Sequence, residues 1–202
     1  MMKFLKILSI GTVFIFLNSI HLSAGKISQK DLDNGLMNLV VYGDLSSVED
    51  YVAQRASVDQ YATDESHFTP GYHILHLALG NPKILEFLII HGSPINSLAK
   101  YGRFTPLHLA SQKGYTKAVQ VLLRNNARQD ILDSDGNSAF DLALLENQLE
   151  IAREFVLNQR EHGKEITINT SSLAKLREEG CEEKIDFWIE YFGDHEFQLR
   201  DE

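Results

Sequence analysis

The chain has 202 residues, of which 44% are hydrophobic, and this combination fits one folded domain of ordinary size with a small appendage. Its formal net charge of −9 keeps it soluble and disfavours non-specific binding to nucleic acid or anionic lipid; a cationic protein partner is the alternative meaning of the charge. Cys181 is the only cysteine, which excludes an internal disulfide, and no Cys/His spacing resembles a zinc site.

Residues 1–24 have the pattern of a secretory signal peptide. Lys3 and Lys6 precede an apolar run over 7–17 that is too short to cross a bilayer comfortably, and Leu22-Ser23-Ala24 suits signal-peptidase cleavage. We therefore expect a mature protein outside the cytoplasm, in a bacterial periplasm or secreted, with no membrane contact after cleavage. Leu22 stands at the third position before the expected cleavage site, where signal peptidase prefers a small residue. An N-terminal anchor that is not cleaved is therefore the alternative. No cysteine follows the run, so lipoprotein attachment is unsupported.

Residues 28–60 predict two helices. Gly43 separates two apolar faces at helical spacing. The faces consist of Leu32, Leu36, Leu39 and Val40 in the first helix, and Val48, Tyr51 and Val52 in the second.

Residues 61–97 predict a second helix pair with displaced edges. Leu75-His76-Leu77-Ala78 begins the first helix, but four residues separate it from Thr69-Pro70, which should directly precede it. A short turn, Gly80-Asn81-Pro82, then precedes a second apolar face at Ile84, Leu85, Leu88 and Ile89.

Residues 98–130 hold the clearest motif, Thr105-Pro106-Leu107-His108-Leu109-Ala110. The Thr105 hydroxyl can cap a helix, and Pro106 at the first helical position gives up an N–H that would be unpaired there anyway. Gly114 is predicted to end this helix in a left-handed conformation. The second helix carries Val119, Leu122 and Leu123 at helical spacing.

This motif resembles the ankyrin-repeat signature T-P-L-H-x-A, which recurs about every 33 residues. The resemblance implies an all-α solenoid of stacked helix-turn-helix units with short β-hairpin loops. We assign four repeats, 28–60, 61–97, 98–130 and 131–160, within a domain covering 25–160. In this family the histidine of the signature usually hydrogen-bonds loop backbone, so His108 and His76 are expected to be structural.

The fourth repeat keeps most positions of the signature. Asp133 and Gly136 match the family's hairpin residues, Ser138 takes the capping position, and Asp141 replaces the histidine. A carboxylate can accept the same kind of backbone hydrogen bonds. Asp130, Asp133 and Asp135 do not form a calcium loop, because the bidentate glutamate at the twelfth position is missing.

Beyond the fourth repeat, residues 161–202 are expected to form a C-terminal cap. Residues 167–172 predict a polar connector, and two short helices broken at Gly180 should follow and cover the last repeat. Their apolar positions are Leu173, Leu176, Ile185, Trp188, Ile189 and Phe192. A docking surface at Trp188, Tyr191 and Phe192 is the alternative. Asn169-Thr170-Ser171 is also a glycosylation sequon, relevant only in a eukaryotic host.

The resemblance implies a non-catalytic module that binds a protein partner through hairpin tips and the inner side of the first helices. It implies no enzymatic activity, cofactor or nucleic-acid partner, and we expect a monomer. Tyr and Arg are favoured at interface hot spots, which draws attention to the hairpin aromatics; Phe104 could equally pack under its own hairpin. The candidate contact residues are Tyr101, Phe104, Gln112, Lys113, Ser134, Asp135, Asn137, Leu145 and Glu146.

Two alternatives remain open. A metal-binding or enzymatic protein could use His73, His76 and His91, although no carboxylate stands at a matching spacing and His76 occupies a structural position. The run Asp64-Glu65-Ser66-His67 does not make a catalytic triad, because neighbouring loop residues lack a positioned base and an oxyanion hole. The second alternative is a protective protein of the cell envelope that shields a partner enzyme.

Overall fold

The computed structural model describes residues 28–62, 71–163, 166–169, 174 and 197–200. The chain divides into two compact units, residues 1–93 and 94–202. The expected signal peptide and the run Asp64-Glu65-Ser66-His67 lie outside the described residues. Within the described part of the chain, no helix combines the length and the hydropathy needed to cross a membrane.

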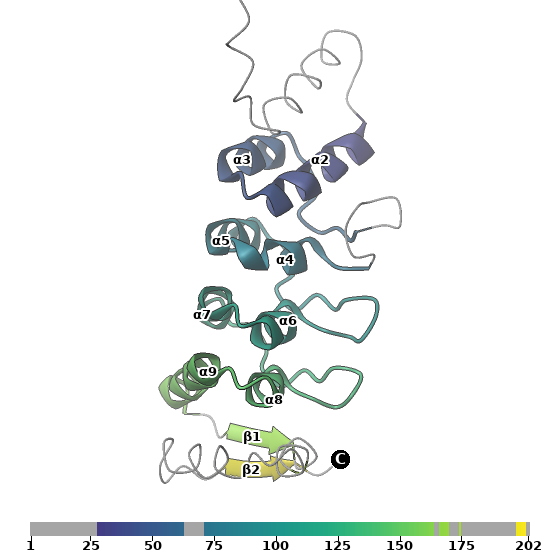
Figure 1. Ribbon diagram of the computed structural model, residues 1–202. Helices are drawn as coiled ribbons and strands as arrows, with labels where there is room; N and C mark the ends of the chain where they lie inside the picture. The colour runs from purple at the N-terminus through teal and green to yellow at the C-terminus, as the bar shows by residue number, and fades with distance from the viewer. Residues whose placement is uncertain (1–27, 63–70, 164–165, 170–173, 175–196, 201–202) are drawn as a thin grey trace, which may run out of the picture. The chain divides into compact units, whose positions relative to one another are not determined.

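Unit one contains two helix pairs. Each first helix packs on the first helix of the other pair, since α2 contacts α4, and each second helix does the same, since α3 contacts α5. This is the arrangement expected of two stacked ankyrin repeats. The elements are α2 (Gln29–Tyr42), α3 (Leu45–Ala53), α4 (Ile74–Leu77), the 3₁₀ helix η1 (Ala78–Gly80) and α5 (Pro82–Ile90) (Figure 1).

Local sequence signals fix the helix ends of unit one. Helix α2 ends at Gly43, whose φ of 80° lies in the left-handed region that favours glycine. Asp44 then caps α3 by accepting from the Ser47 N–H at 3.3 Å, and Asn81 caps α5 in the same way through Ile84. Both predicted helix pairs of this unit are therefore present.

Unit two repeats the arrangement with two further helix pairs. Helix α6 packs beside α8, and α7 packs beside α9. Thr105 and Ser138 start α6 and α8 with reciprocal hydrogen bonds, and Gly114 ends α6 with a φ of 76°. These features confirm the predicted caps. The elements are α6 (Pro106–Lys113), α7 (Thr116–Arg124), α8 (Ala139–Leu145) and α9 (Leu149–Glu161).

His108 joins the two repeats of unit two. Its Nδ1 accepts from the Thr105 N–H at 3.2 Å and lies 2.7 Å from the Thr105 hydroxyl. Its Nε2 lies 3.2 Å from the carbonyl oxygen of Asn137, in the following hairpin. With Nδ1 as the acceptor, the neutral ring carries its proton on Nε2 and donates it to Asn137. The expected structural role of this histidine is confirmed.

The C-terminal segment differs from the expectation. Strand β1 (Ile166–Asn169) pairs in parallel with β2 (Phe197–Arg200), with Ile166 opposite Phe197. The prediction of a polar connector was therefore wrong for 167–169. The sequence Ile-Thr-Ile is rich in β-branched residues, which favour strands, and the neighbouring Asn, Thr and Ser obscured that preference. The two helices predicted over 173–192 lie outside the described residues, apart from Ala174.

Gly35 marks a close approach between two helices of unit one. It is buried in the middle of α2, and a Cβ atom there would overlap Cε1 of Tyr51 and lie 3.1 Å from its Cζ. Alanine is a better helix former than glycine by up to about 1 kcal/mol, but overpacking a core costs about 1 to 3 kcal/mol. The steric cost therefore exceeds the gain in helix propensity.

We predict that Gly35→Ala lowers the free energy of unfolding by about 1 to 2 kcal/mol, measured by urea denaturation followed by circular dichroism. Gly80→Ala is the matched control in the same unit, because no atom lies within 4 Å of its added Cβ. The control should be neutral or slightly stabilising. Equal effects of the two changes would contradict the proposed contact with Tyr51.

The buried His108 predicts a pH-dependent stability. Burial lowers the pKa of His108 below its usual 6.5, despite opposing contributions from the Asn137 carbonyl and nearby carboxylates. The unfolded chain therefore binds a proton at this histidine at a higher pH than the folded protein does. Stability should be complete above about pH 6.5 and fall as the pH drops from there towards the folded pKa, by at most about 1.4 kcal/mol per pH unit.

The measurement is the urea unfolding midpoint between pH 7.5 and pH 5, followed by circular dichroism. His108→Gln should lower stability at neutral pH but make its decline with acid less steep, because one titrating group is gone. His91→Gln, at an exposed position, is the control, and the decline should flatten less in it than in His108→Gln. An unaltered slope in His108→Gln would show that this ring does not titrate on unfolding.

Candidate functional site

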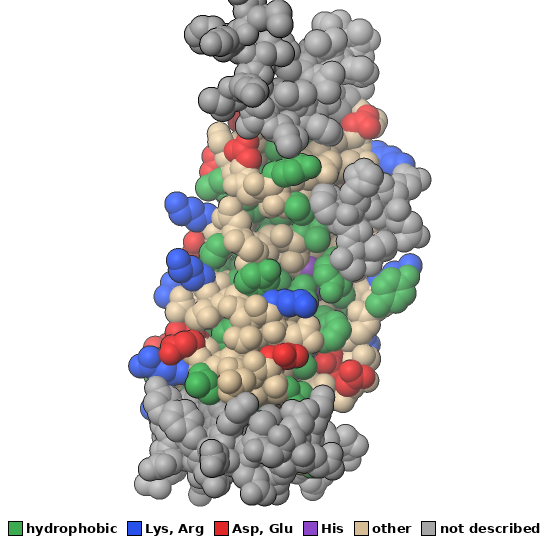
Figure 2. Space-filling view, in the orientation of Figure 1, with side chains coloured by type: hydrophobic (Ala, Val, Ile, Leu, Met, Phe, Trp, Pro, Cys, Tyr) green, Lys and Arg blue, Asp and Glu red, His purple; other side chains and the backbone are tan. Residues whose placement is uncertain are grey.

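The hairpin before α6 presents a cationic and aromatic tip. The side chain of Tyr101 is 63% exposed, and Nζ of Lys100 lies 5.5 Å from the centre of its ring. A backbone hydrogen bond of 2.8 Å from the Ala99 N–H to the Phe104 carbonyl closes the hairpin. Figure 2 shows hydrophobic and basic side chains together at this edge of unit two. The exposed ring and the adjacent cation can contact a partner without rearranging the backbone.

Phe104 packs against the Gly102 position of its own hairpin. A Cβ atom on Gly102, whose φ is 72°, would overlap Cε2 of Phe104 and lie 2.8 Å from its Cδ2. The Phe104 ring also stands edge-on to His108, with 6.3 Å between ring centres. The side chain is half-buried, which agrees with the packing interpretation of Phe104 more than with the binding one.

The hairpin before α8 is tied to the first one. The Ser134 N–H donates to the Gly102 carbonyl oxygen at 3.0 Å, so the two tips are joined by backbone. Buried Asp133 accepts from the N–H groups of Asp135 and Asn137, both at 2.9 Å, which orders the turn. Ser134 and Asp135 are therefore exposed on a fixed backbone, while Asn137 is half-buried and bonded inward.

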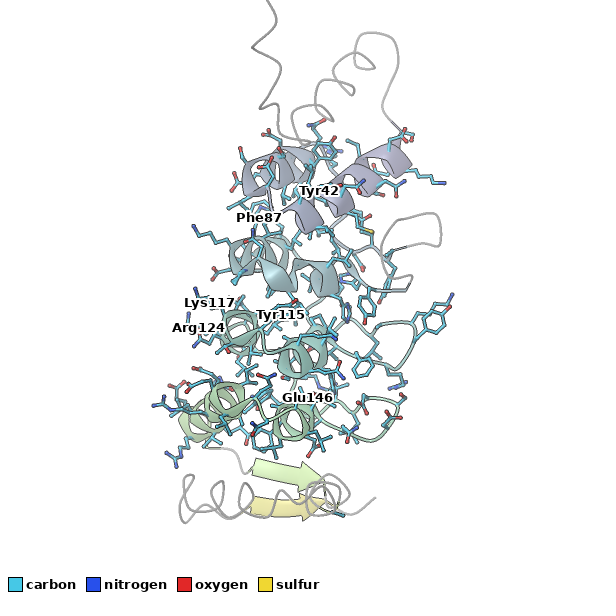
Figure 3. All side chains as sticks on the ribbon, viewed as in Figure 1. Tyr42, Phe87, Tyr115, Lys117, Arg124 and Glu146 are labelled. Carbon is cyan, nitrogen blue, oxygen red and sulfur yellow. The ribbon has the colours of Figure 1, made fainter. Side chains whose placement is uncertain are left out.

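The other four candidate contact residues lie at the C-terminal ends of the neighbouring helices α6 and α8. Lys113 and Glu146 are exposed, and Gln112 and Leu145 are half-buried. Figure 3 labels Glu146 at the end of α8. All nine candidates thus belong to unit two, on two linked hairpins and two adjacent helix ends. The structure brings them onto one unit, and their contact with a partner stays a prediction.

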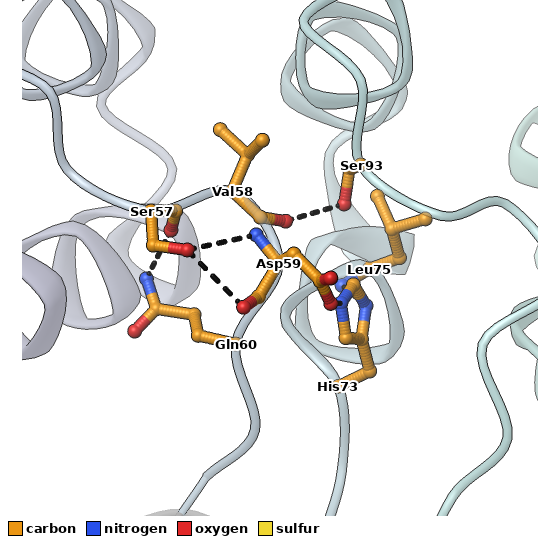
Figure 4. A network of polar contacts seen from close by, with 7 residues as sticks. All are labelled: Ser57, Val58, Asp59, Gln60, His73, Leu75 and Ser93. Carbon is orange, nitrogen blue, oxygen red and sulfur yellow. Dashed lines mark hydrogen bonds and ion pairs between the residues drawn. The ribbon is translucent and has the colours of Figure 1, made fainter.

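His73, in the second repeat, lies in a network of polar contacts (Figure 4). His73 is fully buried and caps α4, because its Nδ1 accepts from the Leu75 N–H at 3.3 Å. Its Nε2 lies 3.2 Å from Oδ1 of Asp59, whose side chain is 66% exposed. Burial lowers the pKa of His73, while the hydrogen bond and charge of Asp59 oppose that shift. A neutral ring that donates from Nε2 fits both contacts.

The three histidines do not converge on one point. The ring of His76 is buried, 6.4 Å from that of His73 and 5.3 Å from that of Tyr72. His91 is exposed at the end of α5, where its ring stacks on Phe87 and its Nδ1 lies 2.8 Å from the Phe87 carbonyl oxygen. Among the described residues, no group of three or more metal-ligating side chains lies close enough to hold an ion.

Sequence reasoning missed two features of these surfaces. The first is the capping role of His73, which replaces the expected Thr-Pro start of the second repeat. His73 lies 32 residues before the cap residue Thr105, and this spacing, close to one repeat, could have indicated the role. The second is an exposed group around α7, formed by Tyr115, Lys117 and Arg124 (Figure 3). A count of charges repeat by repeat would have drawn attention to it.

Known proteins share this repeat pattern. The cyclin-dependent kinase 4 inhibitor B of Mus musculus is 28% identical over 121 residues, which are 60% of this chain and 89% of the inhibitor. The phosphate system positive regulatory protein PHO81 of Saccharomyces cerevisiae is 32% identical over 65 residues, 32% of this chain and 6% of that protein. Protein phosphatase 1 regulatory subunit 12A of Mus musculus is 32% identical over 85 residues, 41% of this chain and 8% of the subunit.

The chain therefore spans less than a tenth of the length of two of these relatives and most of the length of the third. A family model described as ankyrin repeats, in three copies, matches residues 36–131 and 73–170. These matches include the capped helix pairs of both units and the linked hairpins of unit two. Because the family match extends over more than half of the chain, the protein belongs to the ankyrin-repeat family.

Proposed function

We propose that this protein is a non-catalytic module that binds a partner protein outside the cytoplasm, through the linked hairpin tips of unit two. The observation that carries the proposal is that the exposed Tyr101 stands on a hairpin whose backbone is already ordered before a partner binds. Its hairpin is closed by the Ala99–Phe104 hydrogen bond and joined to the next hairpin through Ser134. Preorganisation lowers the entropy lost on binding, so a few exposed side chains can supply the affinity.

The family supports the binding part of this proposal. Relatives are named as an inhibitor of a kinase and as a regulatory subunit of a phosphatase, and both names describe proteins that act on an enzyme. We extend this to the present chain and propose an enzyme as the partner, in agreement with a shielding role in the cell envelope. The residues at the tips supply aromatic, cationic and hydroxyl groups for recognition.

The location is proposed from residues 1–24 alone. Their two lysines, short apolar run and small residues before Gly25 are typical of a cleaved signal peptide. We predict that protein isolated from its native host begins at Gly25, as measured by intact mass and N-terminal sequencing. Recovery of the full chain in the membrane fraction would instead support the uncleaved anchor.

The binding surface can be tested with a photo-crosslinking amino acid placed at Tyr101. We expect crosslinks from this position to one protein in extracts of the native host. Leu157, which is 40% exposed on α9, is the control position and should give none. Equal crosslinking from both positions would argue against a surface at the hairpin tips.

Tyr101→Ala should weaken capture of the crosslinked partner by about tenfold, because truncation of an aromatic hot spot costs more than about 1 kcal/mol. Leu157→Ala should leave capture unchanged. The helical circular dichroism of both variants should match that of the parent protein. Loss of helical signal in Tyr101→Ala would mean that the ring belongs to the core, which would contradict its binding role.

A further inference from the structure

The third repeat has a charge opposite to that of its surroundings. Residues 98–130 contain six of the chain's 19 basic residues and one of its 28 acidic residues. In each of the other three repeats, acidic residues outnumber basic ones. The basic residues of the third repeat are Lys100, Arg103, Lys113, Lys117, Arg124 and Arg128. An acidic protein therefore carries one strongly cationic repeat.

These six cations are all exposed, and their own repeat offers a single counter-charge. Asp130 is that counter-charge and is engaged by Arg128, with Nε 3.0 Å from Oδ1 and Nη2 2.7 Å from Oδ2. Within the described part of the chain, Lys113, Lys117 and Arg124 make no ion pair. Their charges are therefore available to a molecule that approaches from solution.

Two of these cations lie on one face of α7. Lys117 and Arg124 are seven residues apart, which is two helical turns and places them about 10 Å apart along the axis. Figure 3 shows both projecting from the same side of α7, with Tyr115 near the start of the helix, and Figure 2 shows basic side chains gathered beside it. The side chain of Tyr115 is 44% exposed.

The helix packed beside α7 neutralises this face only in part. Gln120 lies between Lys117 and Arg124 in sequence, and its Nε2 donates to Oε1 of Glu154 on α9 at 2.8 Å. That contact gives the carboxylate of Glu154 a neutral hydrogen-bond partner. Helix α9 also carries Glu150 and Arg153, whose charges oppose each other. Helix α7 itself contains no acidic residue.

We infer that Tyr115, Lys117 and Arg124, here called the α7 face, form a second docking surface that takes an acidic segment of a partner protein. A helix with carboxylates seven residues apart, or an extended chain with carboxylates about three residues apart, matches the spacing of the two cations. Tyr115 offers an aromatic contact at the edge, as is common at interfaces. This surface is separate from the hairpin tips and does not depend on the function proposed for them.

Charge favours an acidic protein segment over nucleic acid. A continuous row of phosphates would extend beyond the third repeat onto the acidic fourth repeat, which packs directly beside it in unit two. A pair of acidic side chains can bind both cations of α7 without reaching the fourth repeat. The screening length at physiological salt is about 8 Å, close to the spacing of packed helices, so such a pair senses mainly the α7 face.

The test measures binding of a fluorescein-labelled poly-glutamate peptide to the full chain by fluorescence anisotropy at physiological salt. Lys117→Glu combined with Arg124→Glu should weaken binding by about tenfold or more. The matched control combines Lys30→Glu with Arg55→Glu, which changes the net charge equally at two exposed positions of the first repeat. The control should weaken binding by less than about twofold. Circular dichroism and urea midpoints establish that both variants are folded.

Equal weakening in the two variants would overturn the inference, because it would reflect net charge and not a surface. Failure of poly-glutamate to bind the parent protein would overturn it as well. Binding of labelled oligothymidylate is measured in parallel to test nucleic acid. If the parent protein binds it and the α7 variant loses that binding to the same degree as it loses the peptide, the surface would recognise polyanions in general and not acidic proteins. Tyr101→Ala should leave peptide binding intact, so failure of this inference and failure of the proposed function remain distinguishable.

Discussion

The buried hydrogen bonds that start the first helix of a repeat are the constraint on which the rest of the structure depends. In unit two, the side chains of Thr105 and Ser138 each accept from the backbone N–H of the residue three positions later. The side chain of that residue in turn accepts from the backbone N–H of Thr105 or Ser138, so both N–H groups are paired. In unit one, a histidine ring supplies the capping acceptor for α4. Because unpaired buried polar groups are costly, these caps fix where each first helix begins. The hairpins before α6 and α8 are then held at a defined distance from those helices.

This constraint explains why surface residues can determine function while the frame stays constant. Backbone hydrogen bonds and buried Asp133 hold the two hairpins of unit two, so Tyr101, Ser134 and Asp135 change the recognised chemistry without changing the fold. The same holds for α7, whose buried face consists of Ala118, Val119, Val121, Leu122 and Leu123 while its cations face outward. An interaction module of this kind can accept different partners through substitutions that leave the core intact.

Most of the fold could be predicted from the sequence, because the signals for helix starts and ends are local. Gly43, Gly114, Thr105 and Ser138 each do what their residue type and position indicate. The start of the second repeat could not be predicted in this way, since the cap formed by His73 involves Asp59, fourteen residues earlier in the chain. Strand β1 escaped prediction because its partner begins only at Phe197. At the candidate site, Tyr101, Ser134 and Asp135 are exposed on the hairpins, but the half-buried state of Phe104 and Asn137 depends on packing that sequence alone does not show.

The exchange of histidine for aspartate between the third and fourth repeats changes the hydrogen bonds that this position can make. His108 accepts at Nδ1 and donates at Nε2, so it bonds backward to its own cap and forward to the following hairpin. Asp141 occupies the corresponding position, and its Oδ2 accepts from the Ser138 N–H at 2.8 Å and from the Ser138 hydroxyl at 2.7 Å. A carboxylate acceptor in the fourth repeat thus stands where the third repeat has a ring that both accepts and donates. The chain continues from this repeat into strand β1, which pairs in parallel with β2.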